Sequence, residues 1–133
     1  MSKALLIAGG ILNALFAVNH LAMPSLGQWQ STLSTISAFD QAVVYTLNLA
    51  VAVTLLVFAF VSLFYRRDLL TTNLGKALCI SIALFWLVRA AAQILYFGAA
   101  ENGSWVGVLI FGAVGLLYLI PLFVFKPAQV AAQ

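Results

Sequence analysis

The stretch LFWLVRAAAQILYF, Leu84–Phe97, is apolar enough to lie within a membrane, yet it contains Arg89 and, four residues later, Gln93. Residues spaced four apart share one face of a helix. An arginine near the bilayer centre costs about 2.5–3.5 kcal/mol on insertion scales, so it normally faces polar partners inside a protein. We therefore expect Arg89 and Gln93 to face other helices, which the rest of the chain must supply.

The composition of the whole chain favours lipid as its main solvent. Of 133 residues, 65% are hydrophobic and 7% are charged, whereas soluble domains carry about 25% charged residues. The net charge of +3 is too small and too scattered to indicate nucleic-acid binding. The single cysteine, Cys79, excludes an internal disulfide and a multi-cysteine metal site, and we expect neither a metal nor another cofactor.

Four segments reach the roughly 20 apolar residues that a membrane-spanning helix needs. They are Ala4–Met23, Gln41–Tyr65, Lys76–Phe97 and Trp105–Phe125. A helix satisfies its own backbone hydrogen bonds in lipid, so the sequence predicts an all-α integral membrane four-helix bundle. No repeat or long linker divides the chain, and residues 1–133 are expected to form a single domain.

The basic residues in the connections and at the ends of the spans indicate the orientation. They are Lys3, Arg66, Arg67, Lys76 and Lys126. All of them lie at the N-terminus, in the second connection or at the C-terminus, and four spans place these three regions on the same side. The positive-inside rule therefore predicts a multi-pass protein of the cell inner membrane with both termini in the cytoplasm.

The connection between the first two spans is predicted to contain a short amphipathic helix, Ser25–Ile36. Its apolar residues Leu26, Trp29, Leu33 and Ile36 recur at spacings of three and four, with Gln, Ser and Thr between them. Two interpretations stay open: a helix in the membrane interface anchored by Trp29, or a lid over the space between the spans. Ser37 and Asp40 have the spacing of a capping box that opens the second span.

Polar residues of three predicted spans lie at overlapping depths. With a rise of about 1.5 Å per residue, Arg89 lies roughly 12 Å, Asn48 roughly 10 Å and Asn13 roughly 15 Å from the outer ends of their spans. We therefore predict a polar pocket that opens toward the outer leaflet. Its expected residues are Arg89 as the floor, Asn13, Asn48 and Gln93 as walls, His20 near the mouth, Tyr45 above Asn48, and Trp86 beside the guanidinium.

Arg89 has no acidic residue inside any predicted span as a counter-ion; on the outer side the chain offers only Asp40 and Glu101, at the ends of the spans. Two interpretations of this arginine stay open. It could be a structural residue that bonds carbonyl and amide groups and ties the helices together. Alternatively, the missing anion could come from a ligand or from a partner chain, which would make Arg89 a binding residue.

Three classes of function follow from these residues. The first is a protein that binds or transfers a small anionic or carbonyl-bearing molecule, lipid-like or quinone-like, against Arg89. The second is an accessory or structural subunit that packs against another copy or another membrane protein, for example through Gly112 and Gly115. The third is a membrane enzyme, which is the least expected class. His20 is the only histidine, and no carboxylate pair, nucleophile–base motif or metal cluster accompanies it, so no catalytic residue is predicted.

Several short patterns also resemble those of a group of small, functionally uncharacterised four-helix membrane proteins of bacteria. They are the N-x6-H spacing of Asn13 and His20, the Leu47–Asn48 pair, RRDLLTTNLGKAL in the second connection, and FWLVRAAAQ in the third span. The likeness covers most of residues 4–97. It implies a bacterial inner-membrane protein and implies no particular activity.

Overall fold

The computed structural model describes residues 2–98 and 104–125, and the regular structure of these residues is entirely helical. The helices are α1 (Ser2–Leu26), α2 (Trp29–Thr32), α3 (Ala38–Phe64), α4 (Arg66–Thr71), α5 (Asn73–Phe97) and α6 (Ser104–Val124). Four of them, α1, α3, α5 and α6, are long and apolar enough to cross a membrane. The all-α class and the four helices of membrane-spanning length are thus confirmed, within a few residues of the predicted bounds.

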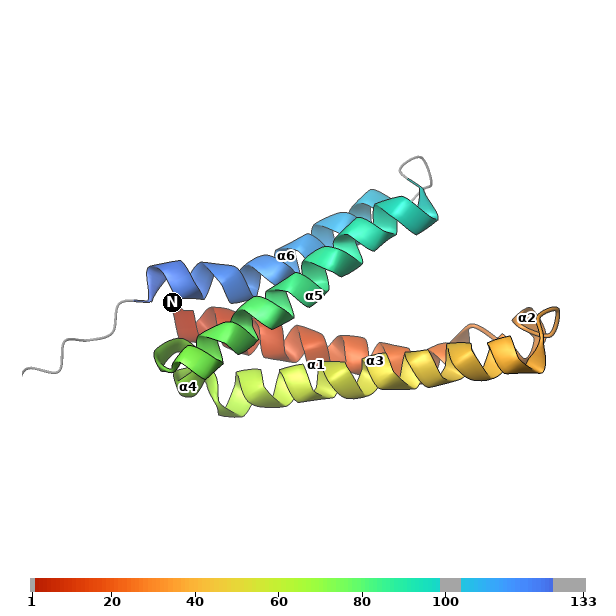
Figure 1. Cartoon of the computed structure of the whole chain (residues 1–133), viewed down its shortest axis with the longest axis horizontal. Coiled ribbons are helices and arrows are strands. Elements are labelled where there is room, and N and C mark those ends of the chain that lie inside the picture. The colour runs from red at the N-terminus through yellow and green to blue at the C-terminus, as the bar shows by residue number, and fades with distance from the viewer. Residues whose placement is uncertain (1, 99–103, 126–133) are drawn as a thin grey trace, which may run out of the picture.

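The four long helices form two antiparallel hairpins, α1 with α3 and α5 with α6 (Figure 1). The hairpins lie close together where α1 begins and where α4 lies, and we call this the closed end. They diverge toward the opposite end, where α2 lies and α5 ends, and we call this the open end. Outward-facing side chains of the long helices are large and apolar; Leu15, Leu47 and Leu109, for example, are 60%, 60% and 71% exposed.

A chain of hydrogen bonds joins one buried side chain from each long helix. Trp86 Nε1 of α5 lies 3.2 Å from Asn13 Oδ1 of α1. The Tyr118 hydroxyl of α6 lies 2.8 Å from Asn13 Nδ2 and 2.7 Å from Ser62 Oγ of α3. These four side chains are at most 2% exposed. Burying polar groups is costly unless they are paired, so this network ties the two hairpins together in one arrangement.

The direction of each hydrogen bond in this network can be assigned from Trp86 at one end and Ser62 at the other. The indole N–H of Trp86 can only donate, so it meets the carbonyl oxygen of Asn13. The Asn13 amide then donates to the Tyr118 hydroxyl. Ser62 directs its single proton to the backbone carbonyl of Phe58, 2.6 Å away, and Tyr118 therefore donates to Ser62. Every donor is used within the protein, which assigns the network to structure and not to ligand binding.

The closed end also contains α4, a short helix that the sequence did not predict. Its Leu69 and Leu70 are each 2% exposed and pack into the core. The N-cap of the following helix, α5, is Thr72, whose hydroxyl accepts a hydrogen bond of 2.9 Å from the backbone N–H of Gly75. Gly75 is in turn so close to α4 that an added Cβ would lie 2.1 Å from the carbonyl oxygen of Asp68.

We expect Gly75→Ala to lower the free energy of unfolding by about 1–3 kcal/mol, because the added methyl group forces backbone atoms apart. Gly112→Ala is the matched control, since a Cβ there meets no atom within 4 Å, and it should leave stability unchanged or slightly raised. Thermal unfolding of the two variants in the same detergent compares them. Equal stability would contradict the close packing of α4 against α5.

The predicted amphipathic helix Ser25–Ile36 is wrong in extent, because only α2, residues Trp29–Thr32, is helical after α1 ends at Leu26. Gln28 has a left-handed backbone (φ 48°), which interrupts the helix. The Ser31, Thr32 and Ser34 hydroxyls bond nearby backbone carbonyls, and such bonds favour turns over a continuous helix.

The predicted cap at the start of the second span is confirmed. Ser37 is the N-cap of α3, and its Oγ accepts a hydrogen bond of 3.1 Å from the backbone N–H of Asp40. The same hydroxyl donates to the Asp40 carboxylate at 2.6 Å. Asp40 therefore stabilises the first turn of α3 together with its N-cap, Ser37.

Candidate functional site

A cleft of about 630 Å³ lies between the two hairpins and is lined by residues of all four long helices. We call it the cleft throughout. Its aromatic lining consists of Phe16, Phe85, Trp86 and Phe111, and its polar lining of Asn19, His20, Ser81 and Arg89; aliphatic side chains and Met23 complete it. The volume falls within the range of about 300–1,000 Å³ typical of small-molecule sites, which are likewise mostly apolar with few polar groups.

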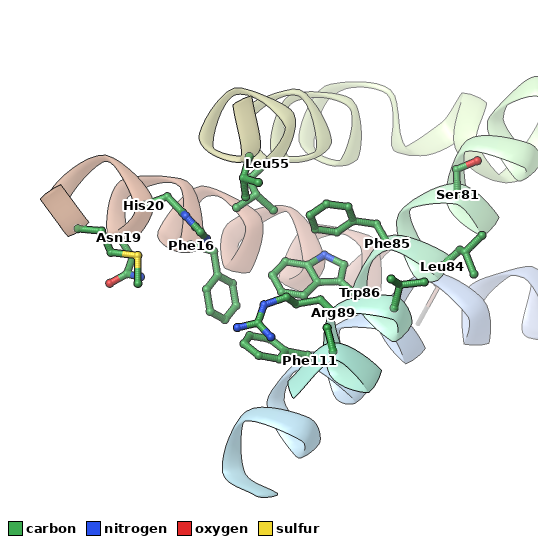
Figure 2. A pocket seen from close by; sticks show the side chains of 14 residues that line it. Phe16, Asn19, His20, Leu55, Ser81, Leu84, Phe85, Trp86, Arg89 and Phe111 are labelled. Carbon is green, nitrogen blue, oxygen red and sulfur yellow. The ribbon is translucent and has the colours of Figure 1, made fainter. Parts of the chain in front are cut away.

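Arg89 projects from α5 into this cleft, between Phe16 and Phe111 (Figure 2). Its Nη1 donates to Gln93 Oε1 at 2.9 Å, which is the contact that their four-residue spacing predicted. The guanidinium carbon lies 4.5 Å from the centroid of the Phe111 ring, within cation–π distance. Arg89 is nevertheless only partly buried by the protein, and no charged residue that the structure describes is buried. The predicted buried arginine is therefore not found.

The two acidic residues in the described part of the chain lie away from Arg89. The Asp40 carboxylate bonds Ser37 at the start of α3, and Asp68 belongs to α4 at the closed end. Within residues 2–98 and 104–125, the only hydrogen bond of the guanidinium is the one to the neutral amide of Gln93. Every buried side-chain nitrogen of the described residues has a hydrogen-bond partner. The Arg89 nitrogens that have no partner are therefore not buried, and a bound molecule can reach them.

His20 lies on the opposite hairpin, and its ring is held by Asn48 of α3. The Asn48 Nδ2 donates to the backbone carbonyl of His20 at 2.8 Å, which fixes the orientation of the amide because a carbonyl can only accept. The Asn48 Oδ1 consequently faces His20 Nδ1, also at 2.8 Å, and this nitrogen must carry a proton. The pair therefore leaves Nε2 as the ring atom that can accept a hydrogen bond.

The remaining predicted site residues separate into different roles. Asn13 is fully buried in the four-helix network, so it is not a wall of the cleft. Asn48 is not a lining residue either, although it orients one. Tyr45 packs edge-on against Trp29, with ring centroids 5.4 Å apart, outside the cleft. Trp86 is shared, because its indole N–H belongs to the network while its ring lines the cleft.

The physical reason for this separation is the angle between the hairpins. Residues at one depth share a site only if the helices converge there, and these helices converge on Asn13 but diverge beyond it. One side of the cleft does have a signal in the sequence. Phe16, His20 and Met23 lie four and seven residues apart along one face of α1. Nothing in the uniformly apolar α6 distinguishes Phe111.

The cleft thus combines a cationic donor from α5, a ring acceptor from α1 and aromatic surfaces from three helices. In the part of the chain that the structure describes, no three His, Cys, Asp or Glu side chains come together as metal ligands. The arrangement is suited to hold an amphiphilic molecule by its polar head. Comparisons of the chain with protein-family models, curated proteins and solved structures found no match.

Proposed function

We propose that this chain is a membrane protein that binds or transfers a small amphiphile whose anionic or carbonyl-bearing head is held against Arg89. One observation carries the proposal: Arg89 faces a largely apolar cleft and has no acidic partner among the described residues. A cation in surroundings of low dielectric attracts an anion or a carbonyl oxygen much more strongly than it does in water. The aromatic and aliphatic lining suits the hydrophobic part of such a molecule.

The proposed location is a bacterial inner membrane, with both termini in the cytoplasm. Arg66, Arg67 and Lys76 lie in α4 and α5 near the closed end, where α1 also begins. The positive-inside rule favours the cytoplasm for this end. The open end then lies in the outer leaflet, and the cleft between the diverging hairpins is within reach of lipid-soluble molecules.

Reporter fusions test this orientation. A reporter that is active only in the cytoplasm should give full activity at both the N-terminus and the C-terminus, because the loop-borne basic residues lie on that side. A fusion at Ser34, in the connection at the open end, is the control and should be inactive. Activity at Ser34, or silence at either terminus, would reject the proposed orientation.

Native mass spectrometry of protein extracted in mild detergent tests the binding proposal. The wild type should carry a bound amphiphile of defined mass, and Arg89→Leu should carry it at a much lower occupancy. Equal occupancy in the two proteins would contradict the role of Arg89.

A second candidate is an accessory subunit of a larger membrane assembly. The observation in its favour is that the two hairpins diverge, which leaves the facing surfaces of α1 and α5 apart at the open end. A partner helix could lie between them, and Arg89 would then meet a group of the partner. Co-extraction of a stoichiometric protein in the same spectra, in place of a small-molecule adduct, would favour this candidate.

A further inference from the structure

The His20–Asn48 pair gives the cleft an acceptor as well as a donor. Asn48 fixes the proton of the neutral imidazole on Nδ1, so that Nε2 presents a lone pair. Nε2 has no hydrogen-bond partner among the residues that the structure describes. Since every buried side-chain nitrogen in these residues has a partner, Nε2 is not buried and a bound molecule can reach it. His20 lines the cleft, so a bound molecule can supply the missing donor.

His20 Nε2 requires a hydrogen-bond donor on the bound molecule, whereas Arg89, on the other hairpin, requires an acceptor. Arg89 only donates hydrogen bonds, and it is suited to a carboxylate, carbonyl or phenol oxygen. A carboxylate alone would place its own lone pairs against Nε2, which offers no attraction. A head group that satisfies both residues therefore carries a hydroxyl group for His20 and an oxygen acceptor for Arg89.

The aromatic lining of the cleft indicates which chemical group joins the ligand's hydroxyl oxygen to its acceptor oxygen. The Trp86 ring has its centroid 4.9 Å from that of Phe16 and 5.6 Å from that of Phe111, and these three rings come from α5, α1 and α6. At such distances the three rings pack against one another, and together they form an aromatic wall of the cleft that suits a flat ring. The Arg89 guanidinium already packs over Phe111, 4.5 Å from its centroid, which keeps the cation beside these surfaces.

We infer that the cleft selects a lipophilic hydroquinone-type molecule, in which one phenol hydroxyl donates to His20 Nε2 and another ring oxygen accepts from Arg89. His20 is then the residue that determines specificity, and Asn48 is its positioning residue. This inference rests on the proposed function and adds to it the chemical class of the head group. It requires no redox step, since it concerns recognition of the hydroxyl form alone.

A displacement experiment on the full chain in lipid nanodiscs tests the inference. Radiolabelled dodecanoate reports occupancy of the cleft, and unlabelled decylhydroquinone, kept reduced under anaerobic conditions, competes with it. Decylbenzoquinone has the same size and both ring oxygens but no hydroxyl, and the dimethyl ether of the hydroquinone also lacks a donor. The hydroquinone should displace dodecanoate at a concentration about tenfold lower than either comparator, as expected for one hydrogen bond to an otherwise unsatisfied acceptor.

Variants separate specificity from folding. In His20→Leu protein that still binds dodecanoate, the hydroquinone and the quinone should displace it at equal concentrations. Asn48→Leu should reduce the ratio between these two concentrations, because Nδ1 loses the acceptor that fixes the tautomer. Ser81→Ala is the matched control: Ser81 lines the cleft, but its hydroxyl donates to the Ala77 carbonyl at 3.0 Å, so the preference should persist.

The role of His20 and the binding role of Arg89 are contradicted by different results. If wild-type protein binds dodecanoate through Arg89 but the hydroquinone and the quinone compete equally, the inference about His20 is wrong and the proposed function stands. The inference is also overturned if the preference survives His20→Leu in protein that still binds dodecanoate. If the wild type binds none of these molecules, the proposed function fails and the inference falls with it.

Discussion

Replacing Arg89 with leucine should weaken dodecanoate binding by about 30-fold or more, because removing one partner of a desolvated, charged hydrogen-bonded pair costs about 2–5 kcal/mol. The helices should remain folded, since the only hydrogen bond that this change removes within the described residues is the one to Gln93. Thermal stability should stay the same or rise, because an arginine within a membrane is itself unfavourable. Scintillation counting of bound dodecanoate and a thermal melt measure the two effects.

Two further variants control this prediction. Arg67→Leu removes the same charge from an exposed position in α4 and should leave binding unchanged. Arg89→Lys should retain part of the affinity, because an ammonium group keeps the charge but lacks the planar fork of the guanidinium. If Arg89→Leu unfolds while Arg67→Leu does not, Arg89 is a structural residue that ties helices together, and the binding role is wrong.

Asn13→Leu should lower the free energy of unfolding by about 1–3 kcal/mol, because it leaves the buried N–H of Trp86 without an acceptor. Asn13 also bonds Tyr118, so the loss affects contacts among α1, α5 and α6 together. Unfolding of the purified protein by a denaturing detergent measures the change. Asn19→Leu is the matched control: Asn19 lies in the same helix, lines the cleft and is exposed, and its side chain has no hydrogen bond to any residue that the structure describes.

Tyr118→Phe refines this test. It keeps the ring that packs against Gly9, where an added Cβ would lie 2.8 Å from the ring, and removes only the hydroxyl. We expect a smaller loss than for Asn13→Leu, because Trp86 keeps its acceptor. Wild-type stability in Asn13→Leu would show that the four-helix network does not hold the two hairpins together.

The long helices could be predicted from the sequence because their signal is local. Some 20 consecutive apolar residues define a membrane-spanning helix without reference to any other segment. The Ser37 cap was predictable for the same reason, since its partner Asp40 lies one turn away. The connection around α2 was not, because hydroxyl-to-carbonyl bonds compete with the helix there, and the spacing of the apolar residues does not reveal that competition.

The candidate site could be predicted only in part, because depth in a membrane does not determine the angle between helices. Arg89 and His20 were expected to share a pocket, and both line the cleft. Asn13 was expected beside them, but the hairpins converge at its level and enclose it in a network with Tyr118. No pattern in the apolar α6 indicates that Tyr118 faces Asn13, since this contact depends on the packing of the two hairpins.

Quenching of Trp86 by brominated dodecanoate tests whether an amphiphile lies in the cleft against Arg89. The chain has three tryptophans, and Trp29→Phe with Trp105→Phe leaves only Trp86, which lines the cleft. We expect saturable quenching of Trp86 that disappears in Arg89→Leu and persists in Arg67→Leu. Quenching that rises without saturation as the probe enters the membrane, or that is the same after Arg89→Leu, would contradict the claim.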